Sequence, residues 1–400
     1  MTDTFSKPVL PLSKHSVQAH LEAHQRPAIP ISDDCLEVWH WVIQGLSDPP
    51  FWGPVSPNDV HRQVKTGEGA LRWERHTEFW SVTFVGEKPP GKETLGQISA
   101  LKAQMVTGLR IALRSERNSD DLPVELRKDH VMRGQFRNGA VQVHTDFWMR
   151  RNGIVNMVVC GSFHNEQDRG RFVKQLIDLE MYRVNVLKGL TLVKPLFGEM
   201  NDLENRYSEL TQSLIGRDEP GLDYVIEEYK SLSAEVGKLL DAARYRIAAT
   251  KAYFEIVQSR LGQLDESPVE GHQSLGEFVS QRLKPAFDTV IAFDNRSKML
   301  LSSLGNSLAL YNAIIENRIQ KQNQALLKNM EQRAAQQVHL AKAVEGFSVI
   351  ALTYYAVGLI AYVTKALDLS HEAWVLAFSV PLIGGLVWLL TNRAKIFGER

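Results

Sequence analysis

The carboxy-terminal part of the chain contains the stretch Gly346-Phe-Ser-Val-Ile-Ala-Leu-Thr-Tyr-Tyr-Ala-Val-Gly-Leu-Ile-Ala-Tyr-Val363, which has no charged residue at any of its 18 positions. As an α-helix it would cover about 27 Å, close to the roughly 30 Å of a bilayer hydrocarbon core. A second uncharged stretch of the same length, Ala373–Leu390, follows after a short link. Helices of soluble cores rarely lack charge for so long, so residues 346–400 predict a two-helix transmembrane hairpin with a short basic tail.

Basic residues around this hairpin predict its orientation. The link between the two stretches has one of them, Lys365, whereas five lie outside the hairpin: Arg333, Lys342, Arg393, Lys395 and Arg400. Basic residues are enriched on the cytoplasmic side of a membrane. We therefore expect a multi-pass protein of a bacterial inner membrane with both termini in the cytoplasm. The first residues of the chain lack the apolar core of a secretory signal, in agreement with this orientation.

Hydroxyl and small residues recur every seven positions in the first apolar stretch. Ser348, Tyr355 and Tyr362 form one such stripe, and Gly358 lies seven residues after Ala351 on another. Such residues typically pack helices together in lipid, within the hairpin or between protomers. Alternatively, the hydroxyl stripe lines a pore through an oligomer. No charged side chain lies inside either stretch, which disfavours a relay of protons or metal ions.

Helical periodicity dominates residues 164–345. Residues 164–285 predict a helical coiled-coil hairpin, because apolar residues alternate steps of three and four along its second half: Val225, Tyr229, Leu232, Val236, Leu239 and Ala243. Residues 286–345, which follow Pro285, predict one long stalk helix. Asn and Gln fill much of residues 317–337, and amides near such a seam fix register and oligomeric state. A solvated helix face is the simplest explanation of these amides, and a polar vestibule on a symmetry axis or docking against the cytoplasmic domain are alternatives.

Residues 1–163 have a different pattern. Turn residues are frequent there, and eleven of the 16 prolines precede residue 124. Two Asn-Gly pairs, at 138–139 and 152–153, flank the alternating segment 140–149, and Asn-Gly is a strong hairpin signal. We expect a cytoplasmic α+β domain with a largely antiparallel sheet.

Two similar pentapeptides in this domain suggest a metal site. The segments are His76-Thr-Glu-Phe-Trp80 and His144-Thr-Asp-Phe-Trp148. If residues 71–84 form one strand, Glu74, His76 and Glu78 share a face. On neighbouring strands, four side chains would then converge as ligands for a divalent cation: His76, Glu78, His144 and Asp146. The alternative is a sheet face crossed by ion pairs with nearby arginines.

Composition excludes several classes of function. The 46 basic and 46 acidic residues balance, so no overall field attracts nucleic acid. Cys35 and Cys160 lack the spacing of a zinc site, and two cysteines cannot form a disulfide framework. Phosphate-binding glycine loops, metalloprotease motifs and nucleophile elbows are absent from the sequence. We therefore predict no catalytic residues and identify no cofactor, apart from the divalent cation considered above.

Segments spread along the chain resemble the bacterial membrane-anchored family of unknown function DUF3422. They are His24–Pro30, Trp73–Phe79, Thr145–Phe147, Leu275–Phe278, Arg282–Pro285, Asn323–Leu327, Val344–Val349 and Tyr354–Gly358. The resemblance implies a two-span inner-membrane protein and brings no established activity. The layout is also similar to that of CorA-type magnesium channels, although their Gly-Met-Asn signature is replaced here by Ala361-Tyr-Val-Thr-Lys365.

Three functions follow from these observations. The first is a non-enzymatic, homo-oligomeric inner-membrane scaffold or sensor with a large cytoplasmic domain. The second is a CorA-like oligomeric ion channel or transporter. The third is a metal-dependent enzyme that uses His76, Glu78, His144 and Asp146.

Overall fold

The computed structural model describes residue 13 and residues 27–33, 36–46, 60–115, 126–214, 222–366 and 372–398. Cys35 lies outside these residues. The chain divides into two compact units, Met1–Ser307 and Leu308–Arg400.

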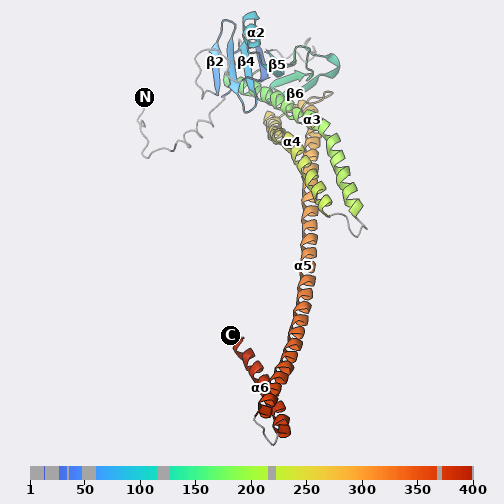
Figure 1. Cartoon of the computed structure of the whole chain (residues 1–400). Helices are drawn as coiled ribbons and strands as arrows, with labels where there is room; N and C mark the ends of the chain where they lie inside the picture. Colours follow the sequence, from blue (N-terminus) through green and yellow to red (C-terminus); the bar gives the residue numbers. More distant parts are fainter. Residues whose placement is uncertain are drawn as a thin grey trace. The chain divides into compact units, whose positions relative to one another are not determined.

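The first unit is built on a nine-stranded mixed sheet (Figure 1). Its strand order is β2-β3-β4-β1-β5-β8-β7-β6-β9, and β5 and β8 form its parallel pair. The other pairs are antiparallel, so the expectation of a largely antiparallel sheet is confirmed. The strands are β1 (Glu37–Gln44), β2 (His61–Lys65), β3 (Ala70–Arg75), β4 (Trp80–Gly86), β5 (Gln104–Arg114), β6 (Met132–Phe136), β7 (Val141–Thr145), β8 (Ile154–Gly161) and β9 (Ser267–Pro268).

Both Asn-Gly pairs lie in connections between paired strands. Residues 137–139 join β6 to β7, and their φ values of 55°, 55° and 83° are those that an Asn-Gly turn favours. The second pair precedes β8, which pairs antiparallel with β7. The two hairpins predicted from these pairs are therefore present.

The segment 71–84 is not one strand. It forms β3 and β4, which pair antiparallel around a tight turn closed by the hydrogen bond from His76 N to Phe79 O (2.9 Å). The alternation of side chains continues on each side of the turn, which is why a single strand was expected. His76 and Glu78 consequently lie in the turn, and Glu74 lies in β3.

The sheet has a different cover on each face. Helices α3 (Glu166–Leu214), α4 (Leu222–Leu264) and the first part of α5 (Leu275–Ala366) form the larger core with one face. Phe172, Val257 and Val279, one from each helix, are each at most 1% exposed in that core. The short helix α2 (Lys92–Ser99) contributes to a second core around Trp73 on the other face. A 3₁₀ turn, η1 (Lys128–His130), precedes β6.

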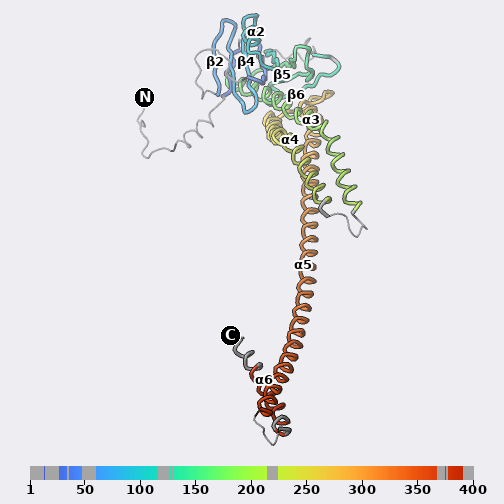
Figure 2. Tube along the Cα trace, in the orientation of Figure 1, coloured from blue at the N-terminus to red at the C-terminus, as the bar shows by residue number. Residues whose placement is uncertain are grey.

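Helices α3 and α4 pack against each other along their length (Figure 2). All six members of the apolar stripe predicted in the second helix are buried: Val225, Tyr229, Leu232, Val236, Leu239 and Ala243. Near their connection, Arg206 pairs with Glu235 at 2.6 Å, and the Tyr207 and Tyr229 rings are 6.1 Å apart. The expected helical hairpin is thus formed by these two helices.

The helix predicted to begin at residue 286 begins earlier, at Leu275, and includes Pro285. Proline removes one backbone donor from a helix. Here Leu283 and Ala286 beside it are 1% and 7% exposed, so packing in the core offsets the lost hydrogen bond. Two further prolines, Pro195 in α3 and Pro381 in α6 (Glu372–Gly398), also lie inside helices.

The second unit contains the remainder of α5 together with α6. An 18-residue window of α5 has a mean hydropathy of 1.7 and no buried residue. Among the described residues, α5 is the one helix long and apolar enough to cross a membrane, and Ala377–Leu390 in α6 is a shorter apolar stretch. A Cβ added at Gly384 would lie 3.7 Å from Thr353 Cγ2, so α5 and α6 are in contact there.

Candidate functional site

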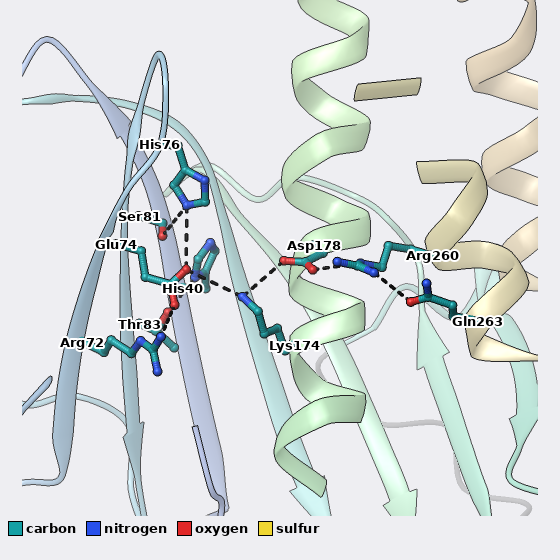
Figure 3. Close-up of polar contacts among 10 residues, drawn as sticks. All are labelled: His40, Arg72, Glu74, His76, Ser81, Thr83, Lys174, Asp178, Arg260 and Gln263. Carbon is teal, nitrogen blue, oxygen red and sulfur yellow. Dashed lines mark hydrogen bonds and ion pairs between the residues drawn. The ribbon is translucent and has the colours of Figure 1, made fainter. Parts of the chain in front are cut away.

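Polar side chains gather on the helix-facing side of the sheet, within an otherwise apolar core (Figure 3). Arg72 and Glu74 come from β3, Thr83 from β4 and His40 from β1. The register pairs Arg72 and His40 each with Thr83, so the four lie across three adjacent strands. All four are at most 7% exposed. The alternating residues, such as Trp73, lie in the core on the opposite face.

An ionic network connects this patch to two helices. Glu74 pairs with Arg72 at 2.7 Å and with Lys174 of α3 at 3.6 Å. Lys174 lies 3.7 Å from Asp178, one helical turn further along α3. Asp178 also accepts a hydrogen bond of 2.9 Å from Arg260 of α4. The network therefore joins the sheet, α3 and α4 through alternating charges, as Figure 3 shows.

The carboxyl group of Asp178 illustrates the balance within this network. Burial raises the pKa of Asp178, while the positive charges of Lys174 and Arg260 act in the opposite direction and Glu74 adds to the increase. Unpaired buried carboxylates are strongly unfavourable, so each charge here depends on its partners. The removal of any one charged side chain from the network should therefore lower the stability of the folded domain.

His40 is a buried imidazole beside the network. Its Nδ1 lies 2.9 Å from Thr83 Oγ1, whereas its Nε2 has no hydrogen-bond partner among the described residues. Burial, together with the charge of Lys174, lowers the pKa of His40 to about 3. The ring is therefore neutral at physiological pH.

A small cavity lies beside the network, and its lining includes both His40 and Glu74 of the sheet. Its volume is about 30 Å³, and it is lined by both polar and apolar side chains, including Lys174, Asp178 and Ile177. A space of this size and polarity holds about one water molecule. It is far smaller than the roughly 300–1,000 Å³ of typical small-molecule sites.

His76 and Glu78 have partners within the first unit. His76 Nε2 lies 3.3 Å from Ser81 Oγ and 3.9 Å from Glu74 Oε2. Glu78 accepts a hydrogen bond of 2.5 Å from the Tyr253 hydroxyl and forms an ion pair with Arg246. Burial raises the pKa of Tyr253 to about 12, so this hydroxyl stays protonated. Glu78 thus anchors the β3–β4 turn to α4.

His144 and Asp146 are placed elsewhere. His144 is buried in β7, where burial lowers its pKa to about 4. Asp146, just after β7, accepts hydrogen bonds from Arg127 N and Trp148 N at 3.0 Å each and pairs with Arg150 at 2.7 Å. Its carboxylate holds the local backbone in place.

The predicted metal site is therefore not assembled. Four strands, β4, β1, β5 and β8, separate β3 from β7. The first pentapeptide lies in the turn between β3 and β4 and at the start of β4, so at about 4.8 Å per strand it is separated from β7 by about 19–24 Å. Among the described residues, no group of three or more His, Cys, Asp and Glu side chains is arranged to hold a metal ion. The convergence of His76, Glu78, His144 and Asp146 was wrong because similar sequences need not occupy neighbouring strands.

The residues predicted to line a transmembrane interface or pore lie in the second unit. Tyr355 and Tyr362 are 70% and 78% exposed, and the Ser348 hydroxyl donates to Val344 O of its own helix. At Gly358 an added Cβ would meet no described atom within 4 Å. These residues are thus available to a partner, whereas the observed contact between α5 and α6 uses Thr353.

Sequence reasoning missed the residues that the helices contribute to the ionic network. Lys174 and Asp178 share a helical face through their four-residue spacing, but Arg260 follows 82 residues later. One available signal was the presence of ionisable residues on a face otherwise occupied by Val173, Leu176 and Ile177. No pattern in the sequence pairs them with Glu74.

A mixed-sheet domain is thus followed by long helices, one of which is apolar enough to cross a membrane. The family model of the protein of unknown function DUF3422 matches residues 17–396, and the chain belongs to this family. A search of curated proteins found no match. The comparisons give no support to the likeness to CorA-type channels.

Proposed function

We propose that this protein is a membrane-anchored, non-enzymatic scaffold or sensor of the bacterial inner membrane. In this proposal α5 and α6 form two membrane spans, and the first unit lies in the cytoplasm. The protein works as a homo-oligomer.

One observation supports the proposed membrane anchor: the most apolar 18-residue window of α5 has no buried residue. Phe347, Ile350 and Leu359 are 74%, 67% and 67% exposed. Each fully buried side chain of this kind is worth about 1.5–3 kcal/mol, and soluble proteins rarely leave such a large apolar surface in contact with water. A lipid environment would remove the free-energy cost of exposing these apolar side chains to water.

Helix α6 supplies the second span of the proposal. Its stretch Ala377–Leu390 is apolar, and Leu382 and Trp388 are 72% and 59% exposed. The contact between Gly384 and Thr353 is typical of helix packing in lipid, where small residues permit close approach. The five basic residues outside the hairpin, against Lys365 in the link, favour cytoplasmic termini.

The proposal of a homo-oligomer is supported by a second exposed pattern, which we call the 319–347 stripe of α5. Its members follow alternating steps of four and three: Ile319, Asn323, Leu326, Met330, Arg333, Gln337, Leu340, Val344 and Phe347. Every member is exposed, including Leu326 at 59% and Leu340 at 67%. Such spacing is typical of a coiled coil, in which polar layers such as Asn323 select the oligomeric state. A second copy of α5 would cover these side chains.

The size of the buried cavity favours a non-enzymatic role for the ionic network. Glu74, Lys174, Asp178 and His40 offer acid–base groups, but a space of about 30 Å³ has no room for a substrate. The network joins sheet and helices, so it serves the stability of the domain.

Alkaline carbonate extraction of membranes from cells that express the full-length chain tests the anchor. We expect the chain to stay in the membrane pellet, because lipid-spanning helices resist a wash that removes peripheral proteins. A chain that ends at residue 345 is the control and should enter the soluble fraction. Release of the full-length chain by carbonate would overturn the proposal.

A further inference from the structure

A second, larger hollow lies in the first unit, distinct from the ionic network. It has a volume of about 650 Å³ and lies between residues 127–132, the end of β7 and residues 271–282. This volume falls within the range of sites that bind small molecules. We call it the Trp148 groove, after the exposed aromatic side chain that contributes to its wall.

Two stacked aromatic rings contribute to the lining of this groove. Phe147 and Phe278 lie with their centroids 5.2 Å apart and their planes within 3° of each other. Phe147 has a φ of 46°, a left-handed conformation that is uncommon for a bulky residue. Hydrogen bonds from Phe147 N to Thr145 Oγ1 and from Trp148 N to Asp146 Oδ1 hold this conformation. Backbone strain of this kind often occurs where a protein positions side chains for binding.

The strained backbone presents Trp148 to solvent. The side chain is 53% exposed, and the Arg127 guanidinium lies 4.3 Å from its ring centroid. An exposed indole with a guanidinium over it offers a flat surface for stacking and a positive charge beside it.

The charges of the groove favour an anion. Neither Arg127 nor Arg282 has a carboxylate partner among the described residues, and Arg282 lies over the Phe278 ring at 5.8 Å. Asp146 is already neutralised by Arg150 and two backbone donors. Asp129 is then the one other carboxylate in the lining, against two guanidinium groups.

We infer that the Trp148 groove binds a planar aromatic anion, whose ring stacks at Trp148 and whose acidic group pairs with Arg127 and Arg282. Stacking on an aromatic side chain is worth about 1–3 kcal/mol per base in single-stranded nucleic acid complexes, and Arg pairs with carboxylate or phosphate through two hydrogen bonds. This binding site goes beyond the proposed anchoring and oligomerisation, and its test does not depend on them.

Calorimetric titration of the detergent-solubilised full-length chain tests the inference. The probes are adenosine 5′-monophosphate and naphthalene-1-sulfonate, with adenosine and inorganic phosphate to separate ring from charge. We expect at least one of the two aromatic anions to bind, and adenosine and phosphate to bind about tenfold more weakly or less. No binding of either aromatic anion overturns the inference, as does phosphate binding as tight as that of the aromatic anions.

Variants locate the binding. Arg282→Gln and Trp148→Ala should each weaken binding about tenfold or more, and Trp148 is exposed, so its removal leaves the core intact. Arg244→Gln is the matched control, because Arg244 is an exposed arginine of α4 that is not among the residues lining the groove. Binding that both groove variants leave unchanged, with circular dichroism confirming their fold, also overturns the inference.

Discussion

The two units of the chain differ in what they bury. In the first unit, charged groups such as Glu74 and Asp178 are 7% and 4% exposed. In the second unit, large apolar side chains such as Phe347 and Tyr362 are 74% and 78% exposed. The buried charges of the first unit find partners within it. Among the described residues, most apolar side chains of the second unit have no such cover, which lipid or another copy of the chain would supply in the proposal above.

The largest effect expected from a single substitution concerns the buried network. Asp178→Ala leaves Arg260 and Lys174 without their shared carboxylate, and should lower the free energy of unfolding by about 3–5 kcal/mol. Urea unfolding followed by tryptophan fluorescence measures this loss. The control is Asp241→Ala, which removes an exposed carboxylate paired with Arg244 and should cost less than about 1 kcal/mol. Equal losses in the two variants would show that the buried network does not stabilise the domain.

Acidification should weaken the first unit through its buried histidines. The folded-state pKa of His40 is about 3 and that of His144 about 4, both below 6.5, so the unfolded chain takes up protons first as the pH falls. Protonation of His40 in the unfolded chain should by itself lower the free energy of unfolding by about 2–3 kcal/mol between pH 7 and 4.5. The raised pKa of Asp178 acts in the opposite direction and offsets part of this loss.

Unfolding of a His40→Asn variant across the same pH range isolates the contribution of His40. The side-chain amide of Asn can take the position of Nδ1, which lies 2.9 Å from Thr83 Oγ1, so the variant should retain this contact. We expect the pH dependence to fall by roughly half, because His144 remains. A variant with an unchanged pH profile would show that His40 is not the group responsible.

Oligomerisation tests the second unit. Leu326 and Leu327 are neighbours that are 59% and 60% exposed, but Leu326 alone belongs to the 319–347 stripe. Leu326→Asp should weaken self-association about tenfold or more, which corresponds to about 1.4 kcal/mol, whereas Leu327→Asp should have a smaller effect. Multi-angle light scattering in detergent measures the mass of each variant. Equal masses for the two variants at every concentration would argue against the stripe as the interface.

The smallest effect is expected at an exposed ion pair. Glu235 accepts two hydrogen bonds from Arg206, and these bonds lower the pKa of Glu235. Both side chains are 44% exposed, so solvent screens the pair. Glu235→Gln should change the free energy of unfolding by less than about 1 kcal/mol, as measured by urea unfolding. A loss as large as that of Asp178→Ala would remove the distinction between buried and exposed charges.

Local signals predicted the fold well. The Asn-Gly pairs located two hairpins, and the stripe from Val225 to Ala243 identified a packed helix, because both patterns depend on residues close in sequence. The turn at residues 76–79 and the start of α5 at Leu275 were missed. At residues 76–79 the alternating pattern predicted one continuous strand, but the pairing of β3 with β4 places a turn there. Pro285 predicted a helix start, but α5 continues through this proline because its neighbours pack in the core.

The sites were harder to predict, for a physical reason. Glu74, Asp178 and Arg260 come together because β3 and two helices pack against each other, and no local pattern records that arrangement. The same limitation led two similar pentapeptides to be placed on adjacent strands. One of them nevertheless pointed to Asp146 and Trp148, which shape the Trp148 groove.

The most direct test of the account is a spin label at Leu352, in the apolar run of α5, and a second label at Leu326, each in full-length chain reconstituted into liposomes. Relaxation by oxygen, which concentrates in lipid, is compared with relaxation by a water-soluble nickel chelate. We predict that the label at 352 responds to oxygen and is protected from nickel, whereas the label at 326 is not in lipid and shows no such preference for oxygen. A label at 352 that nickel relaxes as readily as it does a label on the surface of the first unit would contradict the membrane anchor.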